Sequence, residues 1–402
     1  MLQPLQGIRI LEWAIYHAGP GGPAILGDLG AEVIKIEQPK TGDPLRPRTQ
    51  FGRAYFEFKG RNLFFEGANR NKKSITLDLS KEEGREVAYR LAAKSDVFLT
   101  NIRSTTVEKM KMSYPILKEI NPRLIYASIS AYGSFGPDSW RGGFDYQGQA
   151  RSGMMFSMGE PDMPPLLIHF GVVDQTTAFM ASHAILSALV MRERSGVGQQ
   201  VRISILGSAL ALLYFNTLLA LLDHEMPRPK RTDTDPLRNY YQCKGGKWIC
   251  FTLPTLEPGL WKEFCEAIER PDLENDARFI SSEKRLENCG ELVSILDGIF
   301  ATKTREEWDD ILERHGFFCA PVNESSELKD DPQVTENKYI VDFDHPVFGK
   351  VQFPGYPVHF SEASAGPRTA APELGEHNEE ILREIGGYSA EEIERFREKQ
   401  II

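Results

Sequence analysis

Cysteine is scarce in this chain of 402 residues, and none of the five cysteines belongs to a CxxC pair. An odd number of scattered thiols is typical of a reduced protein, so we expect a cytoplasmic location and no disulfide framework. None of the eight histidines has HExxH or other ligand spacing, and we expect no metal site. A Walker A motif and a GxSxG elbow are also absent. The first residues, Met1 to Leu5, lack the basic and apolar regions of a signal peptide.

Positive charge is also in short supply, because the formal net charge is −10. Nucleic-acid binding needs a concentrated basic face, so we expect no nucleic-acid partner. The composition is otherwise that of a globular protein, with 41% hydrophobic and 26% charged residues. One local basic cluster, Asn69 to Lys73, could still hold a small phosphorylated ligand.

Charge is missing entirely from the segment Ile203 to Leu222, which is long enough to span a bilayer. The segment contains several polar residues, stands alone in the chain, and has no flanking aromatic belt. We therefore expect no membrane association, and interpret it as a helix buried in a core or in an oligomer interface.

The amino-terminal part alternates between strand and helix patterns. We expect strands at residues 8–14, 31–37, 74–79, 96–100 and 124–129, with helical segments between them. A capping box at Ser80 to Glu83 predicts a helix that continues to about Lys94. Such alternation indicates parallel βαβ units and an α/β fold with helices on both faces of the sheet.

A second, smaller domain is predicted beyond the proline-rich segment 227–236. Gly245-Gly246 indicates a hairpin, and helices are expected near 261–269 and 305–314. Two amphipathic helices, near 379–386 and 389–399, are expected to dock on the first domain. The predicted division is a large domain at 1–200, a helical linker at 201–225, a small α+β domain at 226–329, a return linker at 330–345, and a carboxy-terminal part of the large domain at 346–402.

The glycine-rich segment Gly19 to Ala24 follows the first predicted strand and matches GxGxxA, a dinucleotide fingerprint. Two prolines weaken this interpretation, because they remove N–H donors where a pyrophosphate needs them. An NAD-dependent dehydrogenase therefore stays an alternative, and a tight turn that lines another ligand is favoured.

Asp174 precedes a segment that is apolar on nearly every side as far as Met191. An acid at the start of a helix either caps it or takes part in chemistry. A carboxylate held by backbone N–H groups is expected to stay ionised and can attack an activated acyl carbon. His17 follows the first strand, at the edge where α/β sheets bind ligands, but a hydrogen-bonded turn histidine is an equal interpretation.

Several separate motifs occur in one order along the chain, and together they resemble the family III CoA-transferases (the CaiB/BaiF family). The motifs are Leu5-Gln6-Gly7-Ile8-Arg9-Ile10-Leu11, Ala18-Gly19-Pro20, Leu29 to Glu37, Asn121 to Tyr126, Arg194 to Gln199, and Leu374-Gly375-Glu376-His377. The family includes formyl-CoA:oxalate and carnitine CoA-transferases. The resemblance implies a Rossmann-like large domain, with coenzyme A (CoA) as a co-substrate and no permanently bound cofactor.

The resemblance also implies that Asp174 is the nucleophile. Its carboxylate would attack the donor thioester, and CoA would then return to form an aspartyl-CoA thioester. Positions matching the family's CoA contacts by identity are Ala18, Leu77, Asn101 and Met110. Tyr16 belongs to the same set, whereas His17, Gln38, Ile102 and Lys109 match by place but differ in type. Asp145 occupies the place of an active-site acid, although a solvated loop acid is an equal interpretation.

Two functional alternatives stay open besides the transferase and the dehydrogenase. An α-methylacyl-CoA racemase needs a proton-transferring pair, but Phe144 stands where that branch has histidine. A non-catalytic CoA-binding subunit would lack the nucleophile. Because residues 226–241 contain no glycine, we expect an acceptor larger than formate or oxalate, namely a dicarboxylate, an aryl-substituted succinate or a hydroxy acid. The family also implies an interlaced homodimer, and a heteromer with a paralogue stays open.

Overall fold

The computed structural model describes residues 2–224, 228, 230–253 and 259–402. Contacts divide the chain into two compact units. Unit 1 contains the described residues up to Met155, Leu167–His224 and Thr335–Ile402, whereas unit 2 contains Phe156–Leu166 and the described residues of Glu225–Val334. The expected boundary at 225/226 lies outside the described residues.

Unit 1 is built on a six-stranded parallel sheet. Its strands are β1 (Arg9–Trp13), β2 (Glu32–Glu37), β7 (Lys72–Thr76), β8 (Val97–Thr100), β9 (Ile125–Ser130) and β10 (Gln200–Ser204). The order across the sheet is β10-β9-β8-β1-β2-β7. This is the doubly wound order of a Rossmann-like fold, with the reversal between β1 and β8. The expected α/β fold is confirmed, and so are the five predicted strands, to within about three residues at each end.

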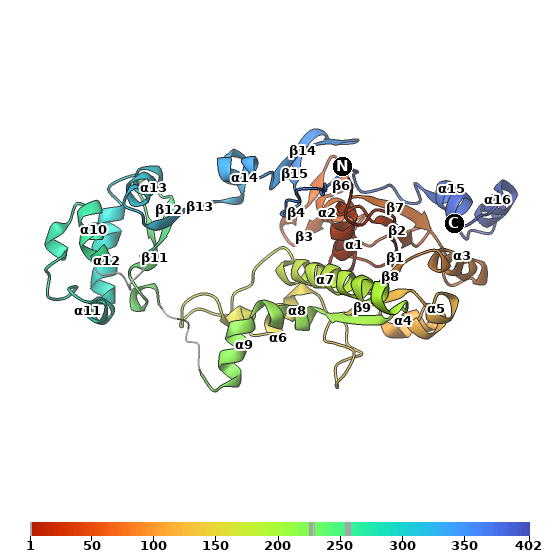
Figure 1. Cartoon of the computed structure of the whole chain (residues 1–402), viewed down its shortest axis with the longest axis horizontal. Coiled ribbons are helices and arrows are strands. Elements are labelled where there is room, and N and C mark those ends of the chain that lie inside the picture. The colour runs from red at the N-terminus through yellow and green to blue at the C-terminus, as the bar shows by residue number, and fades with distance from the viewer. Residues whose placement is uncertain (1, 225–227, 229, 254–258) are drawn as a thin grey trace. The chain divides into compact units, whose positions relative to one another are not determined.

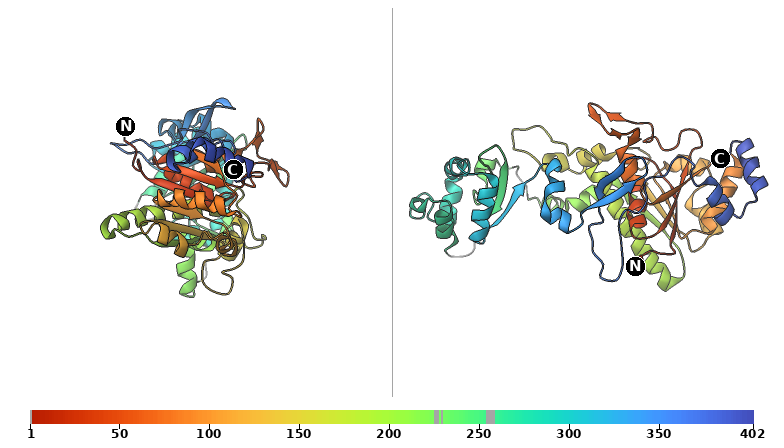
Figure 2. Two further views of the ribbon diagram at one scale, coloured as in Figure 1. Left: turned by 90° about the vertical axis from the view of Figure 1, so that its right-hand side faces the viewer. Right: turned by 90° about the horizontal axis from the view of Figure 1, so that it is seen from above.

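Helices cover both faces of this sheet (Figure 1). On one face, α1 (Ala18–Asp28) and α7 (Val172–Ser195) enclose side chains such as Ile10, Leu99 and Ile185. The other face is covered by α3 (Glu82–Ala93), α4 (Ser104–Lys109), α5 (Tyr114–Ile120) and the carboxy-terminal helices. Figure 2 shows the blue carboxy-terminal helices beside the orange segment of α3 to α5, which is far from them in sequence.

The carboxy-terminal segment consists of α15 (Asn378–Glu380), a π-helical turn (Ile381–Ile385) and α16 (Ala390–Glu398). Ile381, Leu382, Ile393 and Phe396 are buried in the same core cluster as α3. The expectation that these helices dock on the first domain is therefore confirmed.

Shorter elements surround the sheet in unit 1. They are β3 (Gln50–Phe51), β4 (Ala54–Tyr55), β5 (Glu57–Phe58), β6 (Arg61–Asn62), α2 (Leu63–Asn69), α6 (Asp145–Arg151), α8 (Ile205–Leu212), α9 (Tyr214–Leu221), β14 (Ile340–His345) and β15 (Gly349–Pro354). A further helix, α14 (Pro332–Glu336), spans the point where the chain passes from unit 2 to unit 1.

Three local predictions in unit 1 are wrong. The uncharged segment 203–222 is not one helix, because Gln200–Ser204 pairs with β9 as an edge strand and two short helices follow. The return linker 330–345 ends in strand β14, which pairs with β15 and packs Phe343 against Phe353 at 4.8 Å between ring centroids. The Ser80 capping box does not form, because the Ser80 hydroxyl donates to Asp78 and Lys81 is the N-cap residue of α3.

The glycine-rich segment is also not a turn. It forms the first turns of α1, and its glycines allow α1 to pack closely on α7. A Cβ atom added to Gly21 would lie 2.8 Å from the Cβ of Ala178, and one added to Gly22 would lie 3.1 Å from the Cβ of Ala181. The glycines are therefore needed for helix packing.

Unit 2 is a small α+β arrangement. An antiparallel sheet of β11 (Arg238–Gln242), β12 (Trp248–Thr252) and β13 (Phe318–Val322) packs with α10 (Leu260–Ala267), α11 (Ser282–Glu287), α12 (Cys289–Phe300) and α13 (Arg305–Arg314). The hairpin at Gly245-Gly246 and the helices expected near 261–269 and 305–314 are confirmed. The core contains stacked rings of Tyr241, Phe251 and Phe300.

Unit 2 also takes Phe156–Leu166, which the sequence places in the large domain. Hydrogen bonds cause this difference, because the guanidinium of Arg228 donates to the carbonyl groups of Met158, Pro161 and Met163. Within the described residues, no helix is long and apolar enough to cross a membrane.

Candidate active site

The predicted site residues lie at the carboxyl ends of adjacent parallel strands. Tyr16, His17 and Ala18 follow β1, Gln38 follows β2, Leu77 follows β7, and Asn101 and Ile102 follow β8. Because β1 and β8 are neighbours at which the strand order reverses, the residues after them border the crevice where doubly wound sheets bind ligands. The topology therefore brings these residues to one edge of the sheet.

Asp174 lies in the first turn of α7. The helix begins after Phe170 and Gly171, whose φ angles of 70° and 78° turn the chain sharply before the helix. Gly171 is the N-cap residue, so Asp174 does not cap the helix. Its side chain is partly buried, and its Oδ1 atom is inaccessible to water and has no hydrogen-bond partner among the described residues.

Asp145 takes the hydrogen bonds that Asp174 was expected to receive. The Asp145 Oδ2 atom accepts from the backbone N–H groups of Val173 at 2.6 Å and Asp174 at 3.0 Å. Its Oδ1 atom accepts from the Gln149 side chain at 2.5 Å, and only 6% of the residue is exposed. Asp145 is therefore a buried carboxylate that caps α7 from another helix, and the solvated-loop interpretation is wrong.

The electrostatic result is a less acidic Asp174. Burial, together with the nearby negative charge of Asp145, raises the pKa of Asp174 to about 7. The expectation that backbone N–H groups keep Asp174 ionised is wrong, because two of those donors point to Asp145 instead. Near neutral pH this carboxyl group exchanges between its protonated and ionised forms.

His17 faces the same turn of α7 from the start of α1. Its Nε2 atom lies 2.8 Å from the Oε1 atom of Gln175, the residue after Asp174. Burial lowers the pKa of His17 below its ordinary value, so the imidazole is neutral at pH 7. Since an amide oxygen only accepts, Nε2 carries the hydrogen, and the buried Nδ1 is an acceptor with no partner among the described residues.

Asn101 joins the ends of β1 and β8. Its side-chain oxygen accepts from the backbone N–H of Ile15 at 2.9 Å, and its amide donates to the Ile15 carbonyl at 2.7 Å. A Cβ atom at Gly19 would lie 2.7 Å from the Cγ of Asn101. The Tyr16 N–H donates to Asp43 at 3.2 Å. These contacts fix the loop that carries Tyr16 and His17, whatever ligand it binds.

The other predicted CoA contacts differ in whether their side chains are already hydrogen-bonded, buried or exposed. The Gln38 side-chain oxygen accepts from the backbone N–H groups of Lys40 and Thr41, so it closes its own turn. Leu77 is buried, and Ile102 and Met110 pack partly against the same core cluster. Lys109 is exposed at the end of α4, and its amine has no ion pair with any residue that the structure describes.

The basic cluster at residues 69–73 does not form a phosphate site, because its cations are already paired. Arg70 pairs with Asp28, and Lys73 pairs with Glu32 and Glu380. Lys72 is buried, where its amine pairs with Glu12 and donates a hydrogen bond to the Pro20 carbonyl. Burial lowers the pKa of Lys72 to about 7 despite that partner. The amine of Lys72 therefore supports the first turn of α1. Within the described residues, no group of three or more potential ligands is arranged to hold a metal ion.

A family model described as CoA-transferase family III matches residues 5–378, which is most of the chain. The chain belongs to this family. It is thus an enzyme that uses CoA as a co-substrate, and the edge of the sheet that carries His17 and faces Asp174 is the candidate active site of a CoA-transferase.

Relatives match this CoA-transferase along nearly its full length. An "Acyl-CoA transferase" of Fusarium pseudograminearum is 34% identical over 99% of this chain and 88% of its own length. A "Succinyl-CoA:glutarate CoA-transferase" of Mus musculus is 31% identical over 98% and 89%. A "(R)-2-hydroxy-4-methylpentanoate CoA-transferase" of Clostridioides difficile is 30% identical over 99% of each chain.

Solved structures have the same fold as this CoA-transferase. A CaiB/BaiF family protein from Brucella suis superimposes with a TM-score of 0.85 at 30% identity, covering 96% of this chain and all of that one. A Mycobacterium tuberculosis protein, solved with one aspartate changed to alanine, superimposes with a TM-score of 0.78 at 31% identity over 95% and 99%.

Three features of this CoA-transferase site were missed by sequence reasoning. They are the hydrogen bond of Gln175 with His17, that of Gln149 with Asp145, and the packing of the Phe64 ring on His17. Gln175 was detectable, because it follows Asp174 directly and lies one residue further along the same turn. Gln149 lies one helical turn after Asp145, so it was also within reach of sequence analysis.

Proposed function

We propose that this CoA-transferase moves CoA from an acyl-CoA donor to a carboxylic acid acceptor through a covalent aspartyl-CoA thioester on Asp174. One observation carries the proposal. Among the described residues, Asp174 keeps a buried carboxylate oxygen without a hydrogen-bond partner, while the nearby Asp145 accepts three hydrogen bonds. Hydrogen bonds lower the nucleophilicity of a carboxylate, so Asp174 is the better nucleophile of the two.

The chemistry keeps a carboxyl group activated at every step, either as a thioester or as an anhydride. The Asp174 carboxylate attacks the donor carbonyl carbon, so that an anhydride forms and CoA thiolate leaves. The thiolate then attacks the aspartyl carbon of the anhydride and releases the donor acid. The acceptor carboxylate attacks the aspartyl-CoA thioester, so that a second anhydride forms and CoA thiolate leaves again. The thiolate finally attacks the acceptor's carbonyl carbon in this anhydride, which frees Asp174. Water must be excluded, because it would hydrolyse both intermediates.

Asp145 and His17 support this sequence in different ways. Asp145 is a positioning residue, because it anchors the start of α7 by its hydrogen bonds to Val173 and Asp174. His17 offers an unpartnered Nδ1 acceptor, which can take a hydrogen bond from an N–H group of the pantetheine arm. Tyr16, Ala18, Asn101, Ile102, Met110 and Lys109 are proposed to line the CoA path, together with Gln38 and Leu77 at the neighbouring strand ends.

A larger acid than formate or oxalate is the proposed acceptor. The names of two relatives support it, because one is described for glutarate and another for a branched hydroxy acid. The absence of glycine from residues 226–241 also supports a substrate that needs more room than formate. We propose a dicarboxylate, an aryl-substituted succinate or a hydroxy acid.

The proposed assembly is an interlaced homodimer in the cytoplasm. Helix α9 supports a partner chain, since it has no buried residue although it is largely apolar, with Phe215 75% and Leu221 76% exposed. Apolar patches of this kind mark protein–protein contacts. Five free thiols support a reducing location.

A racemase is the less favoured function. Phe144, which stands at the place of a proton-transferring histidine, has no ionisable group and is 57% exposed against the ring of Tyr16. Deuterium uptake at the α-carbon of a 2-methylacyl-CoA, with no acceptor acid present, would favour the racemase instead.

The proposal is tested by mass spectrometry of the protein after incubation with acyl-CoA. We expect a CoA adduct on the peptide that contains Asp174, and its discharge when an acceptor acid is added. The Asp174→Ala variant should lose the adduct and at least about 10³-fold in turnover. Asp310→Asn, on the exposed surface of α13, is the matched control and should behave as wild type. Wild-type turnover by Asp174→Ala would refute the proposal.

A further inference from the structure

Arg48 is a cation that the proposed chemistry does not use. Its guanidinium lies 4.8 Å from the ring centroid of Phe51 and 5.9 Å from that of Tyr16. The side chain is exposed and forms no ion pair with any described residue. By contrast, Arg46, two residues earlier, is held by two hydrogen bonds to Glu37. Arg48 is therefore free to bind an anion at the surface of these rings.

The rings around Arg48 form two sets, one of Tyr16 and Phe144 and one of four phenylalanines, and Arg48 joins the sets because it lies over both Tyr16 and Phe51. We call the two sets together the aromatic wall. It consists of Tyr16, Phe51, Phe56, Phe64, Phe144 and Phe170, and comes from four separate segments of unit 1. Within each set, the centroids of contacting rings are 4.6 to 6.3 Å apart, and the rings lie edge to face. Such contacts are favourable and fix the ring positions relative to each other.

The aromatic wall connects Arg48 with the nucleophile. Phe64 packs against His17 at 6.4 Å between centroids, and His17 is hydrogen-bonded to Gln175, next to Asp174. Phe170, which is 65% exposed, precedes the Gly171 turn that begins α7. The rings and the Arg48 cation therefore lie on the side of His17 that leads to the turn with Asp174.

We propose that Arg48 binds a second carboxylate on the acyl group, so that this enzyme selects dicarboxylic acids whose carbon chain lies against the aromatic wall. The inference rests on the proposed function and narrows its substrate class. A guanidinium presents a planar pair of N–H donors that matches a carboxylate, and its stacking on Tyr16 and Phe51 pre-orients it. The phenyl rings suit the methylene or aryl part of such an acid. A hydroxy acid without a second carboxylate could also lie against these rings, but it would gain nothing from Arg48.

Acceptors of matched length separate the contribution of the second carboxylate from that of the chain. We compare glutarate with pentanoate, and use one donor throughout so that its effect cancels in the ratio of kcat/KM values. Wild type should prefer glutarate. Arg48→Met keeps the apolar stem over the rings but loses the charge, and should lower the glutarate-to-pentanoate ratio by about 10- to 100-fold. Arg48→Lys should retain part of the preference.

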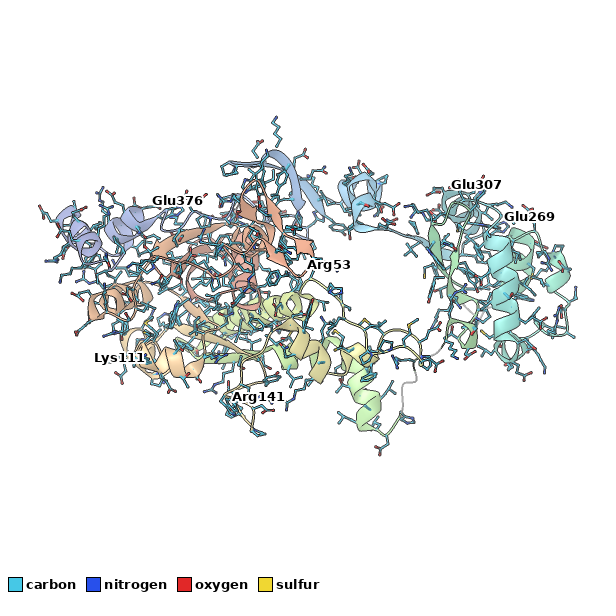
Figure 3. The ribbon with its side chains drawn as sticks, turned by 180° about the vertical axis from the view of Figure 1, so that it is seen from behind. Arg53, Lys111, Arg141, Glu269, Glu307 and Glu376 are labelled. Carbon is cyan, nitrogen blue, oxygen red and sulfur yellow. The ribbon has the colours of Figure 1, made fainter. Side chains whose placement is uncertain are left out.

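The control is Arg53→Met, which removes another exposed cation close to Arg48 in sequence, in the turn between β3 and β4, labelled in Figure 3. It should leave the ratio unchanged. A charge reversal sharpens the test, because Arg48→Glu should shift the preference from glutarate towards 5-aminopentanoate, whose distal amine is positive.

The outcomes distinguish this inference from the proposed function. An Asp174 adduct that forms normally, with an equal ratio in wild type and Arg48→Met, would overturn the role of Arg48 and leave the proposed function standing. An Arg48→Met variant with weaker CoA binding and an unchanged ratio would mean that Arg48 binds the CoA phosphates, and would also overturn the inference. No adduct in wild type with any acyl-CoA would contradict the proposed function itself.

Discussion

The first turns of helices α6 and α7 each contain an aspartate, and the two residues are in opposite states. Asp145 in α6 accepts three hydrogen bonds and is 6% exposed, whereas Asp174 in α7 has a buried oxygen with no partner among the described residues. The N–H groups at the start of α7 stabilise a carboxylate of another helix. The difference teaches that a helix start can place its backbone donors on a carboxylate of another helix and leave its own carboxylate underpartnered, as the proposed role of Asp174 requires.

The largest expected effect is the pH dependence of adduct formation, which tests whether Asp174 is the less acidic carboxyl group that this contrast requires. Since the pKa of Asp174 is raised to about 7, only about 1% of it is ionised at pH 5. In single turnovers with acyl-CoA alone, the adduct should form about 100-fold more slowly at pH 5 than at pH 8.

His17→Gln is the control for the pH experiment, because His17 is the other titrating group at this turn. The variant should keep the same acidic limb. A rate that is equal at pH 5 and pH 8 in wild type would mean that Asp174 is as acidic as an ordinary aspartate.

Asp145→Asn tests the effect of the Asp145 charge on Asp174, because it removes the negative charge while keeping an oxygen for the α7 N–H groups. Loss of a like charge should lower the pKa of Asp174 and move the acidic limb of the rate to lower pH. The new amide faces the Gln149 amide, donor against donor, so we expect kcat to fall by about tenfold. The side-chain amide of Gln149 cannot flip to remove this clash, because its oxygen already accepts a hydrogen bond from the backbone N–H of Ile168. A tenfold loss without movement of the limb would limit Asp145 to a structural role.

The smallest expected effect is on stability. The folded state keeps the Asp174 proton to about pH 7, whereas an unfolded aspartate loses it near pH 4, so the carboxyl group destabilises the fold increasingly as pH rises between these values. Asp174→Asn removes this penalty and should stabilise the protein by about 1–2 kcal/mol at pH 8, which raises Tm by a few degrees.

The same variant should match wild type at pH 4, where Asp174 is protonated in both states. Asp310→Asn, on the exposed surface of α13, should change Tm at neither pH. A Tm of Asp174→Asn below that of wild type at pH 8 would show that the ionised carboxylate is stabilised by contacts that the structure does not contain.

The strands of unit 1 and their common edge could be predicted because they depend on local patterns. Runs such as Ile8 to Ala14 are apolar and bounded by turn residues, and alternation with helices implies a parallel sheet. Edge strand β10 was missed, since its residues continue without a break into an apolar segment that is typical of a helix. The glycines of α1 were misassigned for a similar reason, because the partner they accommodate, α7, lies about 150 residues later.

The candidate site was predictable as a set of residues but not as an electrostatic arrangement. The family motifs locate Asp174 and Asp145, but no local pattern says that Asp145 would take the N–H groups of Val173 and Asp174, which are 28 and 29 residues away. The raised pKa of Asp174 is a consequence of that pairing. The contact of Arg48 with Tyr16 likewise depends on the tertiary fold.

Isotope transfer from the acceptor tests the central claim most directly. If the acceptor carboxylate attacks an aspartyl-CoA thioester, one of its oxygens must end on Asp174 when CoA thiolate releases the product. After turnover with ¹⁸O-labelled acceptor, the account predicts label in the Asp174 carboxyl group and none in that of Asp145. Label on Asp145, or an unlabelled Asp174 after many turnovers, would contradict it.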